Sequence, residues 1–228
     1  MIHYIVNWLG FAVCHQLPER TLHYGLAALP TCARCSGIYV GLLAGFVYLV
    51  AANRKHESGF PPWWALAFGA VGLGLMGLDG VSSYAGWRPT SNELRLITGL
   101  LAGSALPLVL VPMFNFQAWQ DASEDRIIKG WADFGLYCLV IVAAFLAFQY
   151  RPGWLYWPFY LINGGAIVLA FVYTNAILVV LLPWWSQKAV KVRDLAVPLL
   201  IAGVMGFGEL AASYWLHALV LAKLGQIG

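Results

Sequence analysis

Three of the four cysteines in this chain lie on either side of a short polar stretch. Cys14 ends one apolar segment and is followed by His15, whereas Cys32 and Cys35 form a C-x-x-C motif directly before another apolar segment. Two thiolates at this spacing can bind one soft metal ion, or one thiol can attack a partner disulfide while the other resolves it. The spacing is compatible with both chemistries.

A zinc site is the interpretation that we favour for these residues. A structural zinc ion takes four ligands, and the three clustered cysteines with His15 would supply a Cys₃His set. Neighbouring residues of a helix point about 100° apart, so Cys14 and His15 can share an ion only beyond a helix end. Otherwise His23 would be the fourth ligand.

Two other interpretations of the cysteines stay open. In the first, the C-x-x-C motif exchanges disulfides with a quinone as cofactor, although enzymes of that kind generally use a second cysteine pair that this chain lacks. In the second, the thiols are inert or form a simple disulfide. The fourth cysteine, Cys138, lies in an apolar run and is expected to pack as a small hydrophobic residue.

A second group of polar residues lies between two apolar segments. Asp79 closes one run, and Arg88, Asn92 and Arg95 surround the start of the next. Because hydrocarbon solvates neither charge, we expect Asp79 to form an ion pair with Arg88 or Arg95. These four residues are candidate catalytic residues in the wall of an anion or headgroup pocket. The alternative is a loop in which an ion pair and a Ser91 or Asn92 cap pin two helix ends.

The elements that must position these residues are membrane helices. The hydrophobic class makes up 61% of the chain and the charged class 10%, whereas soluble domains carry about 25% charged residues. A spanning helix needs about 20 mostly apolar residues. Six segments approach that length, at 37–52, 63–78 (continuing toward 81), 94–114, 131–150, 162–183 and 195–221. A seventh segment, 2–17, is short and either spans the bilayer or lies in its interface.

The expected fold is therefore an all-α transmembrane bundle of six or seven spans with short loops. We treat residues 1–228 as one membrane domain, in which 1–115 carry the motifs and 116–228 add further helices. The formal net charge is only +3 and no basic block is present, so the sequence shows no nucleic-acid surface. The expected partners are membrane lipid and a lipophilic small molecule that enters between helices.

The loops that connect these segments alternate between the two membrane faces. The loops at 53–62, 116–130 and 186–194 hold seven basic residues, and the opposite face holds six. We assign the first set to the cytoplasm by the positive-inside rule, which places the cysteines outside. The loops 18–36 and 82–93 then share a face, which favours one site built from both polar groups.

Small residues recur at four-residue intervals in two of the apolar segments. Gly37, Gly41 and Gly45 follow this spacing, and Gly99 with Gly103 repeats it. In membranes such residues let two helix backbones approach closely. We expect them to form packing faces.

One carboxylate lies in the middle of the last apolar run. Glu209 either binds an ion, stays protonated, or bonds with Asn163 or Asn175 across the bundle. A transporter that uses Asp79 and Glu209 as ion sites is therefore a further functional class to consider, as is a noncatalytic subunit of a membrane complex. Familiar catalytic motifs lack a supporting context here, so no enzyme class is assigned.

The residues in two blocks are similar to those of a known family. CHQLPER at 14–20 and CARCSGIYVG at 32–41 resemble the signature of small predicted membrane proteins of bacteria and archaea called domain of unknown function 2085. Asp79-Gly80 and NELRLITG at 92–99 resemble the second block of that family. The resemblance covers roughly residues 10–110 and implies a multi-pass protein of a prokaryotic cell membrane. It implies no activity.

Overall fold

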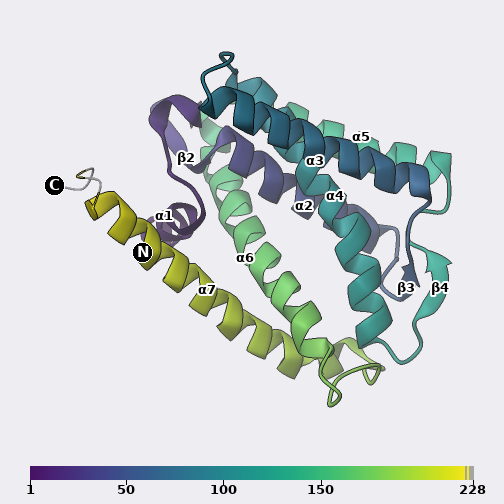
Figure 1. The fold of residues 1–228 in the computed structure, drawn as a ribbon. Coiled ribbons are helices and arrows are strands. Elements are labelled where there is room, and N and C mark those ends of the chain that lie inside the picture. Colours follow the sequence, from purple (N-terminus) through teal and green to yellow (C-terminus); the bar gives the residue numbers. More distant parts are fainter. Residues whose placement is uncertain (224, 226–228) are drawn as a thin grey trace.

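A computed structural model describes residues 1–223 and 225 of the chain. Six long helices run between the two ends of one bundle (Figure 1). Their bounds are α2 Ala33–Ala51, α3 Trp63–Tyr84, α4 Asn92–Ala118, α5 Trp131–Gln149, α6 Tyr156–Val180 and α7 Ala196–Lys223. All six are long and apolar enough to cross a membrane. The predicted all-α transmembrane bundle is confirmed, and the chain is a multi-pass protein of the cell membrane.

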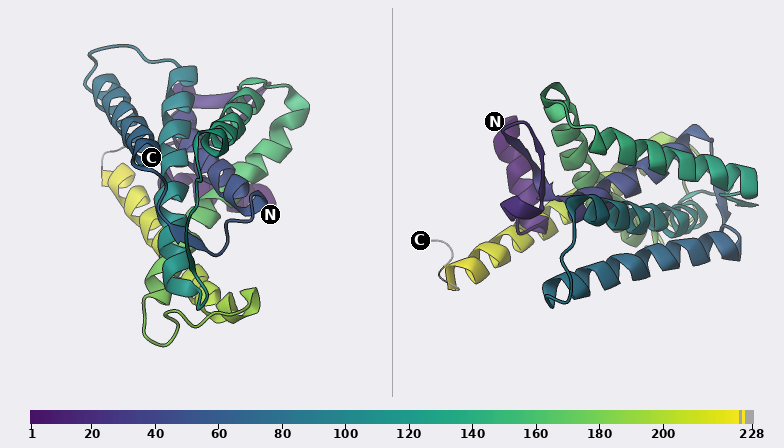
Figure 2. Two further views of the ribbon diagram at one scale, coloured as in Figure 1. Left: turned by 90° about the vertical axis from the view of Figure 1, so that its right-hand side faces the viewer. Right: turned by 90° about the horizontal axis from the view of Figure 1, so that it is seen from above.

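The first helix, α1 (Ile2–Val13), lies across the long helices. It is seen end-on in Figure 1 and stands across the bundle in the right-hand view of Figure 2. Its 12 residues span about 18 Å, whereas the hydrocarbon core is about 30 Å thick. The helix is thus too short for a span, and the described chain has six candidate spans. An interfacial position for segment 2–17 stays a prediction.

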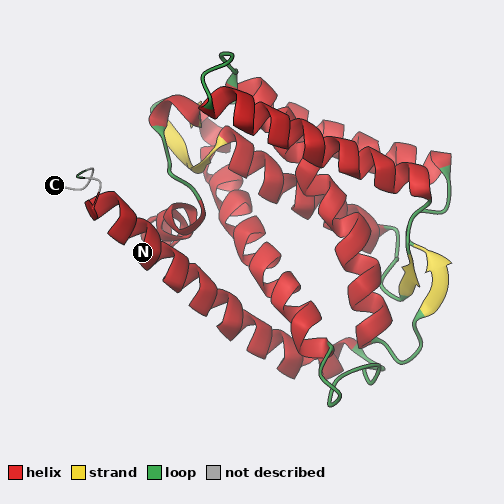
Figure 3. Ribbon diagram, in the orientation of Figure 1, coloured by secondary structure: helices red, strands yellow, loops and turns green. Residues whose placement is uncertain are grey.

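Successive spans run in opposite directions, so the loops gather at two ends (Figure 3). We call the end with Cys14, Cys32 and Cys35 the cysteine end, and the other, where the α2–α3 loop carries Arg54, the Arg54 end. The α3–α4 loop and the last turn of α7 also lie at the cysteine end. We expect the C-terminus to share this end with Cys32, although its last residue, Gly228, is outside the described residues.

Two short sheets organise loops that the sequence pattern presents as irregular. At the cysteine end, β1 (Thr21–Tyr24) and β2 (Ala27–Cys32) pair as an antiparallel hairpin. Gly25 occupies its turn with a φ of +64°, which glycine adopts without strain. At the Arg54 end, β3 (Glu57–Gly59) pairs in parallel with β4 (Ser123–Arg126). Three single turns of 3₁₀ helix complete the chain, namely η1 Pro18–Arg20, η2 Gly153–Leu155 and η3 Val192–Leu195.

Helices α2 and α4 pack backbone to backbone along the predicted glycine faces. Gly37 faces the backbone of Leu96 and Leu100, and Gly103 faces the backbone of Ile38, so that an added Cβ at either glycine would overlap main-chain atoms. Gly41 and Gly99 lie in the same contact. Gly45 differs, because it packs under the Tyr137 ring of α5. The backbone contact between α2 and α4 holds the start of α2, and with it the C-x-x-C motif, against the start of α4.

Three helices begin earlier than their apolar runs suggest. Helix α2 starts at Ala33 rather than at residue 37, because the polar residues of the cysteine motif already form its first turn. Helix α4 starts at Asn92, where the Ser91 hydroxyl caps the helix by accepting from the Leu94 N–H at 3.2 Å. Helix α6 starts at Tyr156 rather than at 162. A hydrophobic run shows how much of a helix can face lipid. The capping residues show where the helix begins and ends, which can lie beyond that run.

Candidate metal centre

The C-x-x-C motif lies at the junction of β2 and α2. Cys32 ends the strand and is the N-cap of the helix, so that Cys35 is the third helical residue. Side chains at the N-cap and third positions meet at the start of a helix, as they do in a capping box. The positive end of the helix dipole also favours thiolates there. The spacing brings the two sulfurs together because the second cysteine is already helical.

Cys14 joins this pair from the end of α1. The helix ends one residue earlier, Cys14 is extended, and Gln16 turns the chain with a φ of 52°. The Gln16 side-chain amide donates to the Pro30 carbonyl at 2.7 Å and fastens the turn to β2. The Sγ atoms of Cys14, Cys32 and Cys35 consequently lie within 4.8 Å of one another. The predicted convergence of three thiols is present.

The three thiols are free, lie close to one another and are largely shielded from solvent. Cys14 is buried, and Cys32 and Cys35 are half-buried. The backbone N–H of Cys32 donates to Cys14 Sγ at 3.2 Å. Hydrogen bonding with Cys14 lowers the pKa of the Cys32 thiol, and the same contact raises the pKa of Cys14. The cluster therefore favours a thiolate at Cys32, which is the form that binds metal.

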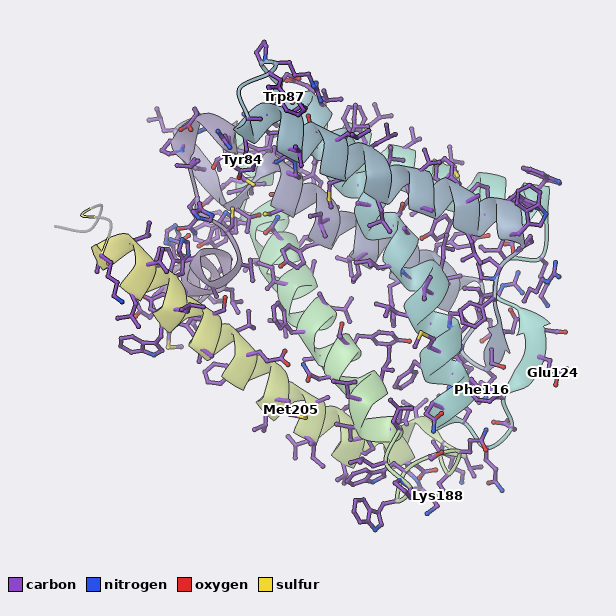
Figure 4. All side chains as sticks on the ribbon, viewed as in Figure 1. Tyr84, Trp87, Phe116, Glu124, Lys188 and Met205 are labelled. Atoms are coloured by element: carbon purple, nitrogen blue, oxygen red, sulfur yellow. The ribbon has the colours of Figure 1, made fainter. Side chains whose placement is uncertain are left out.

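A small cavity of about 70 Å³ borders the three sulfurs. His15, Arg20 and Tyr84 are also in its wall. The Arg20 guanidinium carbon lies 4.7 Å from the centre of the Tyr84 ring, and Figure 4 labels Tyr84 at this end of the bundle. Arg20 Nη1 is buried without a hydrogen-bond partner in the described part of the chain. One wall of the cavity is thus cationic.

The histidines lie around the thiol cluster rather than within it. Among the described residues, the group of ligand atoms that converges here is formed by cysteines alone. His15 is exposed, and its ring lies edge-on to His217 of α7, with 4.7 Å between the ring centres. His23 bonds to the Pro18 carbonyl oxygen at 3.1 Å. His15 reaches the wall of the cavity, so it is better placed than His23 to complete a site.

Asp79 is the centre of an ion-pair network beside the cysteine motif. Its carboxylate is 1% exposed and accepts from Arg88 at 2.9 Å and from Thr90 at 2.8 Å, which confirms the predicted Asp79–Arg88 pair. Arg34, inside the C-x-x-C motif, donates to the same carboxylate. The sequence does not predict this contact, because 45 residues separate the partners. A cation between two cysteines at a membrane helix start is the signal that could have found it.

Arg95 and Asn92 connect α4 to the hairpin. Arg95 donates to Asn92 Oδ1 at 2.8 Å and forms no ion pair with Asp79, unlike Arg88. The Asn92 amide in turn donates to the backbone carbonyls of Glu19 at 3.2 Å and Thr21 at 3.4 Å. The loops 18–36 and 82–93 therefore meet at one end of the bundle, as the single-site hypothesis requires.

The side chains of the second group lie beside the cavity, not in its wall. Asp79, Arg88, Asn92 and Arg95 are absent from the residues that line it. Their contacts are with one another, with the hairpin and with Arg34. Their catalytic role stays a prediction, whereas their contacts show how the cysteine turn is held in place.

Glu209 bonds with one of the two predicted asparagines. The Asn175 amide of α6 donates to Glu209 Oε2 at 2.8 Å. Asn163 instead bonds to Thr31 Oγ1 at 3.1 Å, next to the cysteine motif. The bond from Asn175 ties α7 to α6 in the middle of the bundle.

Comparisons with known proteins bear on the segment that carries this site. The family described as Predicted membrane protein (DUF2085) matches residues 14–109. That segment begins at Cys14 and includes the hairpin, α2, α3 and most of α4. Helices α5, α6 and α7 lie outside it, and no solved structure matches the chain.

Two archaeal relatives share the same region. An uncharacterized protein of Methanocaldococcus jannaschii is 34% identical over 102 residues, which are 45% of this chain and 64% of that protein, so less than two thirds of its length is matched. An uncharacterized protein of Methanothermobacter thermautotrophicus is 34% identical over 98 residues, which are 42% of this chain and 83% of that protein. This chain belongs to the DUF2085 family of predicted membrane proteins.

Proposed function

We propose that this membrane protein binds one zinc ion between Cys14, Cys32 and Cys35. The observation that carries the proposal is the approach of the three Sγ atoms to within 4.8 Å of one another. Zn–S bonds are about 2.3 Å long, so three sulfurs on a tetrahedral zinc lie roughly 3.8 Å apart. A small inward movement of the side chains is enough to reach that geometry.

The surroundings of the cluster support thiolates rather than thiols. Four arginines lie at this end, namely Arg20, Arg34, Arg88 and Arg95. Two of them, Arg34 and Arg88, share the buried carboxylate of Asp79. Nearby cations favour the charged form of a thiol. Zinc with three thiolates carries a net negative charge, which this surplus of guanidinium groups balances.

We assign the fourth ligand position to His15. The residue follows Cys14 beyond the end of α1, where it is free of the helical geometry that would separate the two side chains. It lies on the wall of the cavity that the three sulfurs border. Turning its ring away from His217 and into the cavity completes the Cys₃His set.

A structural role fits this site better than a quinone reaction. The cavity of about 70 Å³ is far below the roughly 300–1,000 Å³ of pockets that enclose drug-sized ligands. Three thiols are an odd number for disulfide exchange, but they suit a zinc site. The ion would join the end of α1, the hairpin and the start of α2, three segments with little core of their own.

The second polar group has a positioning role in this proposal. Asp79 holds Arg34, and Asn92 holds the hairpin, so both fix the backbone that carries the cysteines. Groups beyond the ligands orient a metal site in this way, and their loss lowers metal affinity by about 10–100-fold. Arg88 bonds to Asp79 and Arg95 bonds to Asn92, so each arginine supports one of these two residues.

Metal analysis of the purified full chain tests the proposal. We expect about one zinc per chain, with the Cys35→Ser variant losing it and the Cys138→Ser variant keeping it. Cys138 is the matched control because it is a free cysteine in α5, away from the cluster. X-ray absorption should show Zn–S distances of about 2.3 Å with a single nitrogen neighbour. His15→Ala should replace that nitrogen with oxygen from water.

A different result would replace zinc with redox chemistry. Metal-free protein in which a Cys32–Cys35 disulfide forms and is reduced again, measured by thiol labelling and intact mass, contradicts the zinc proposal. Equal zinc content in the Cys35→Ser and Cys138→Ser variants would place the metal elsewhere on the chain.

A further inference from the structure

A larger cavity, of about 320 Å³, lies at the Arg54 end and is not used by the proposed zinc site. Helices α2, α4, α6 and α7 supply its apolar walls, which include Leu49, Phe114, Leu169 and Leu199. Figure 4 labels Phe116 and Lys188 at this end of the bundle, opposite Tyr84. Helix α2 has 19 residues and is about 28 Å long, so it separates the cavity from the cysteines.

Two buried donors at this cavity lack partners. Trp119 is 4% exposed, and its indole Nε1 forms no hydrogen bond within the described part of the chain. The same holds for Nε of Arg54. Both residues line the cavity. A buried donor without an acceptor costs about 1–3 kcal/mol, so two at one cavity point to an acceptor that the chain itself does not supply.

The side chains around these donors are held in place. The His56 ring stacks on Trp119, with 4.4 Å between the ring centres. Arg54 donates to Glu57 at 3.0 Å through Nη1 and to Asp133 at 3.2 Å through Nη2, so Nε is its one guanidinium nitrogen without a partner. The two donors therefore keep fixed directions without a ligand.

The charge at the opening of the cavity is positive. Glu57 and Asp133 already match the charges of Arg54 and Lys129. Lys55 also lines the cavity, is exposed, and has no ion pair among the described residues. Lys191 and Arg193 flank Val192, another lining residue, and Asp194 beside them offsets one of these two charges. Basic residues at a membrane face attract anionic headgroups by about 1 kcal/mol each.

We infer that this cavity binds one acyl chain of an anionic membrane lipid. The chain lies against the apolar walls, and an oxygen of the headgroup accepts from Trp119 Nε1 and Arg54 Nε. Lys55 lies beside the headgroup and balances its charge. A pocket that is mostly apolar, with a few fixed donors at one end, is typical of a site for an amphiphile.

Native mass spectrometry of the full chain, released from mild detergent, tests the inference. The probes are phosphatidylglycerol and phosphatidylcholine with identical acyl chains, each added in a titration. We expect one phosphatidylglycerol to bind at least tenfold more tightly than phosphatidylcholine. Trp119→Phe removes the N–H donor but keeps an aromatic ring, and it should lower the affinity for phosphatidylglycerol about tenfold. Lys55→Gln should lower the same affinity about fivefold.

Matched variants at the same membrane face separate this site from the surface. Trp184→Phe and Lys188→Gln change the same residue types outside the cavity lining and should leave lipid affinity unchanged. Leu199→Trp fills the cavity and should abolish the selective binding. Leu169→Phe is a smaller filling change that covers the case in which the first variant fails to fold.

Three results would overturn the inference. The first is equal affinity for the two lipids, since the donors and Lys55 would then not distinguish the two headgroups. The second is unchanged binding in folded Leu199→Trp and Leu169→Phe. The third is displacement of the lipid by a neutral quinone at an equal concentration, which would assign the two donors to a carbonyl ligand.

Discussion

The two ends of the bundle each carry an ion-pair network, but the two networks differ in charge balance. At the cysteine end one carboxylate, that of Asp79, receives both Arg34 and Arg88. At the Arg54 end, Glu57 and Asp133 both receive Arg54, and Glu57 also receives Lys129 at 3.0 Å. The first network has a surplus of positive charge, whereas the charges in the second balance.

This difference indicates what each end is built to hold. Unbalanced guanidinium groups beside three thiols favour thiolates, and therefore a metal ion between the sulfurs. At the Arg54 end the buried charges are matched within the chain, and Lys55 is exposed at the opening of an apolar cavity. In the two proposals, the surplus charge at the cysteine end balances zinc-bound thiolates, and the exposed charge at the Arg54 end meets a lipid headgroup.

The largest expected effect comes from removing the shared carboxylate. Asp79→Asn leaves two guanidinium groups beside a neutral side chain and should lower the free energy of unfolding by about 3–5 kcal/mol. Glu57→Gln should cost less than half of that, because Arg54 keeps Asp133 as a partner. Denaturant unfolding in detergent measures both. Equal losses would show that the two networks do not differ in the way described above.

Removal of zinc should loosen one end only. At free zinc 100-fold above its dissociation constant, binding stabilises the folded site by about 2.7 kcal/mol, so chelation should speed local hydrogen exchange about a hundredfold. We expect this change at residues 14–35 and not at 119–130. Hydrogen–deuterium exchange with and without a chelator measures it. A similar change at both ends, or none, would contradict a zinc ion that acts locally.

The glycine contact joins the backbones of α2 and α4, so its glycines should tolerate no larger side chain. Gly103→Ala places a Cβ against the backbone of Ile38 and should cost about 1–3 kcal/mol of unfolding free energy. Gly74→Ala is the control, since nothing lies within 4 Å of its added Cβ. Alanine there should stabilise helix α3 by up to about 1 kcal/mol. Thermal unfolding that shows the same sign for both variants would refute the packing argument.

The smallest effect is expected midway between the ends. Glu209→Gln keeps an oxygen that accepts from the Asn175 amide, so it should change stability by no more than about 0.6 kcal/mol. Transport or binding of an ion that depends on Glu209 would instead show a large functional loss with normal stability. Unfolding measurements and a proton-flux assay in liposomes separate these outcomes.

Composition and local spacing were sufficient to predict the main features of the fold. Runs of apolar residues identified all six spans, because hydrocarbon leaves no alternative to a helix for a single backbone segment. The C-x-x-C spacing indicated two meeting thiols, and alternating loops put 18–36 and 82–93 at one face. The four-residue spacing of Gly37 with Gly41, and of Gly99 with Gly103, predicted a close contact between helices, and the structure contains it.

Local structure at the loops could not be obtained in the same way. The hairpin of β1 and β2 depends on pairing between two strands, and neither strand alternates clearly between apolar and polar residues. The length of segment 2–17 left two interpretations open, because it was near the limit for a span. The packing of α1 across α7 and α6 is a tertiary feature that its sequence does not show.

The partners of individual charges were decided by tertiary structure alone. Asp79 pairs with Arg34, which is 45 residues away in the sequence. Arg95 is closer to Asp79 in the sequence, but it bonds to Asn92 instead. Apolar runs and helix caps act through neighbouring residues, so the sequence determines them directly. Ion pairs and cavities depend on which helix faces meet, and that is set by the glycine contact of α2 with α4 and by the turn that returns Cys14 to the cysteine motif.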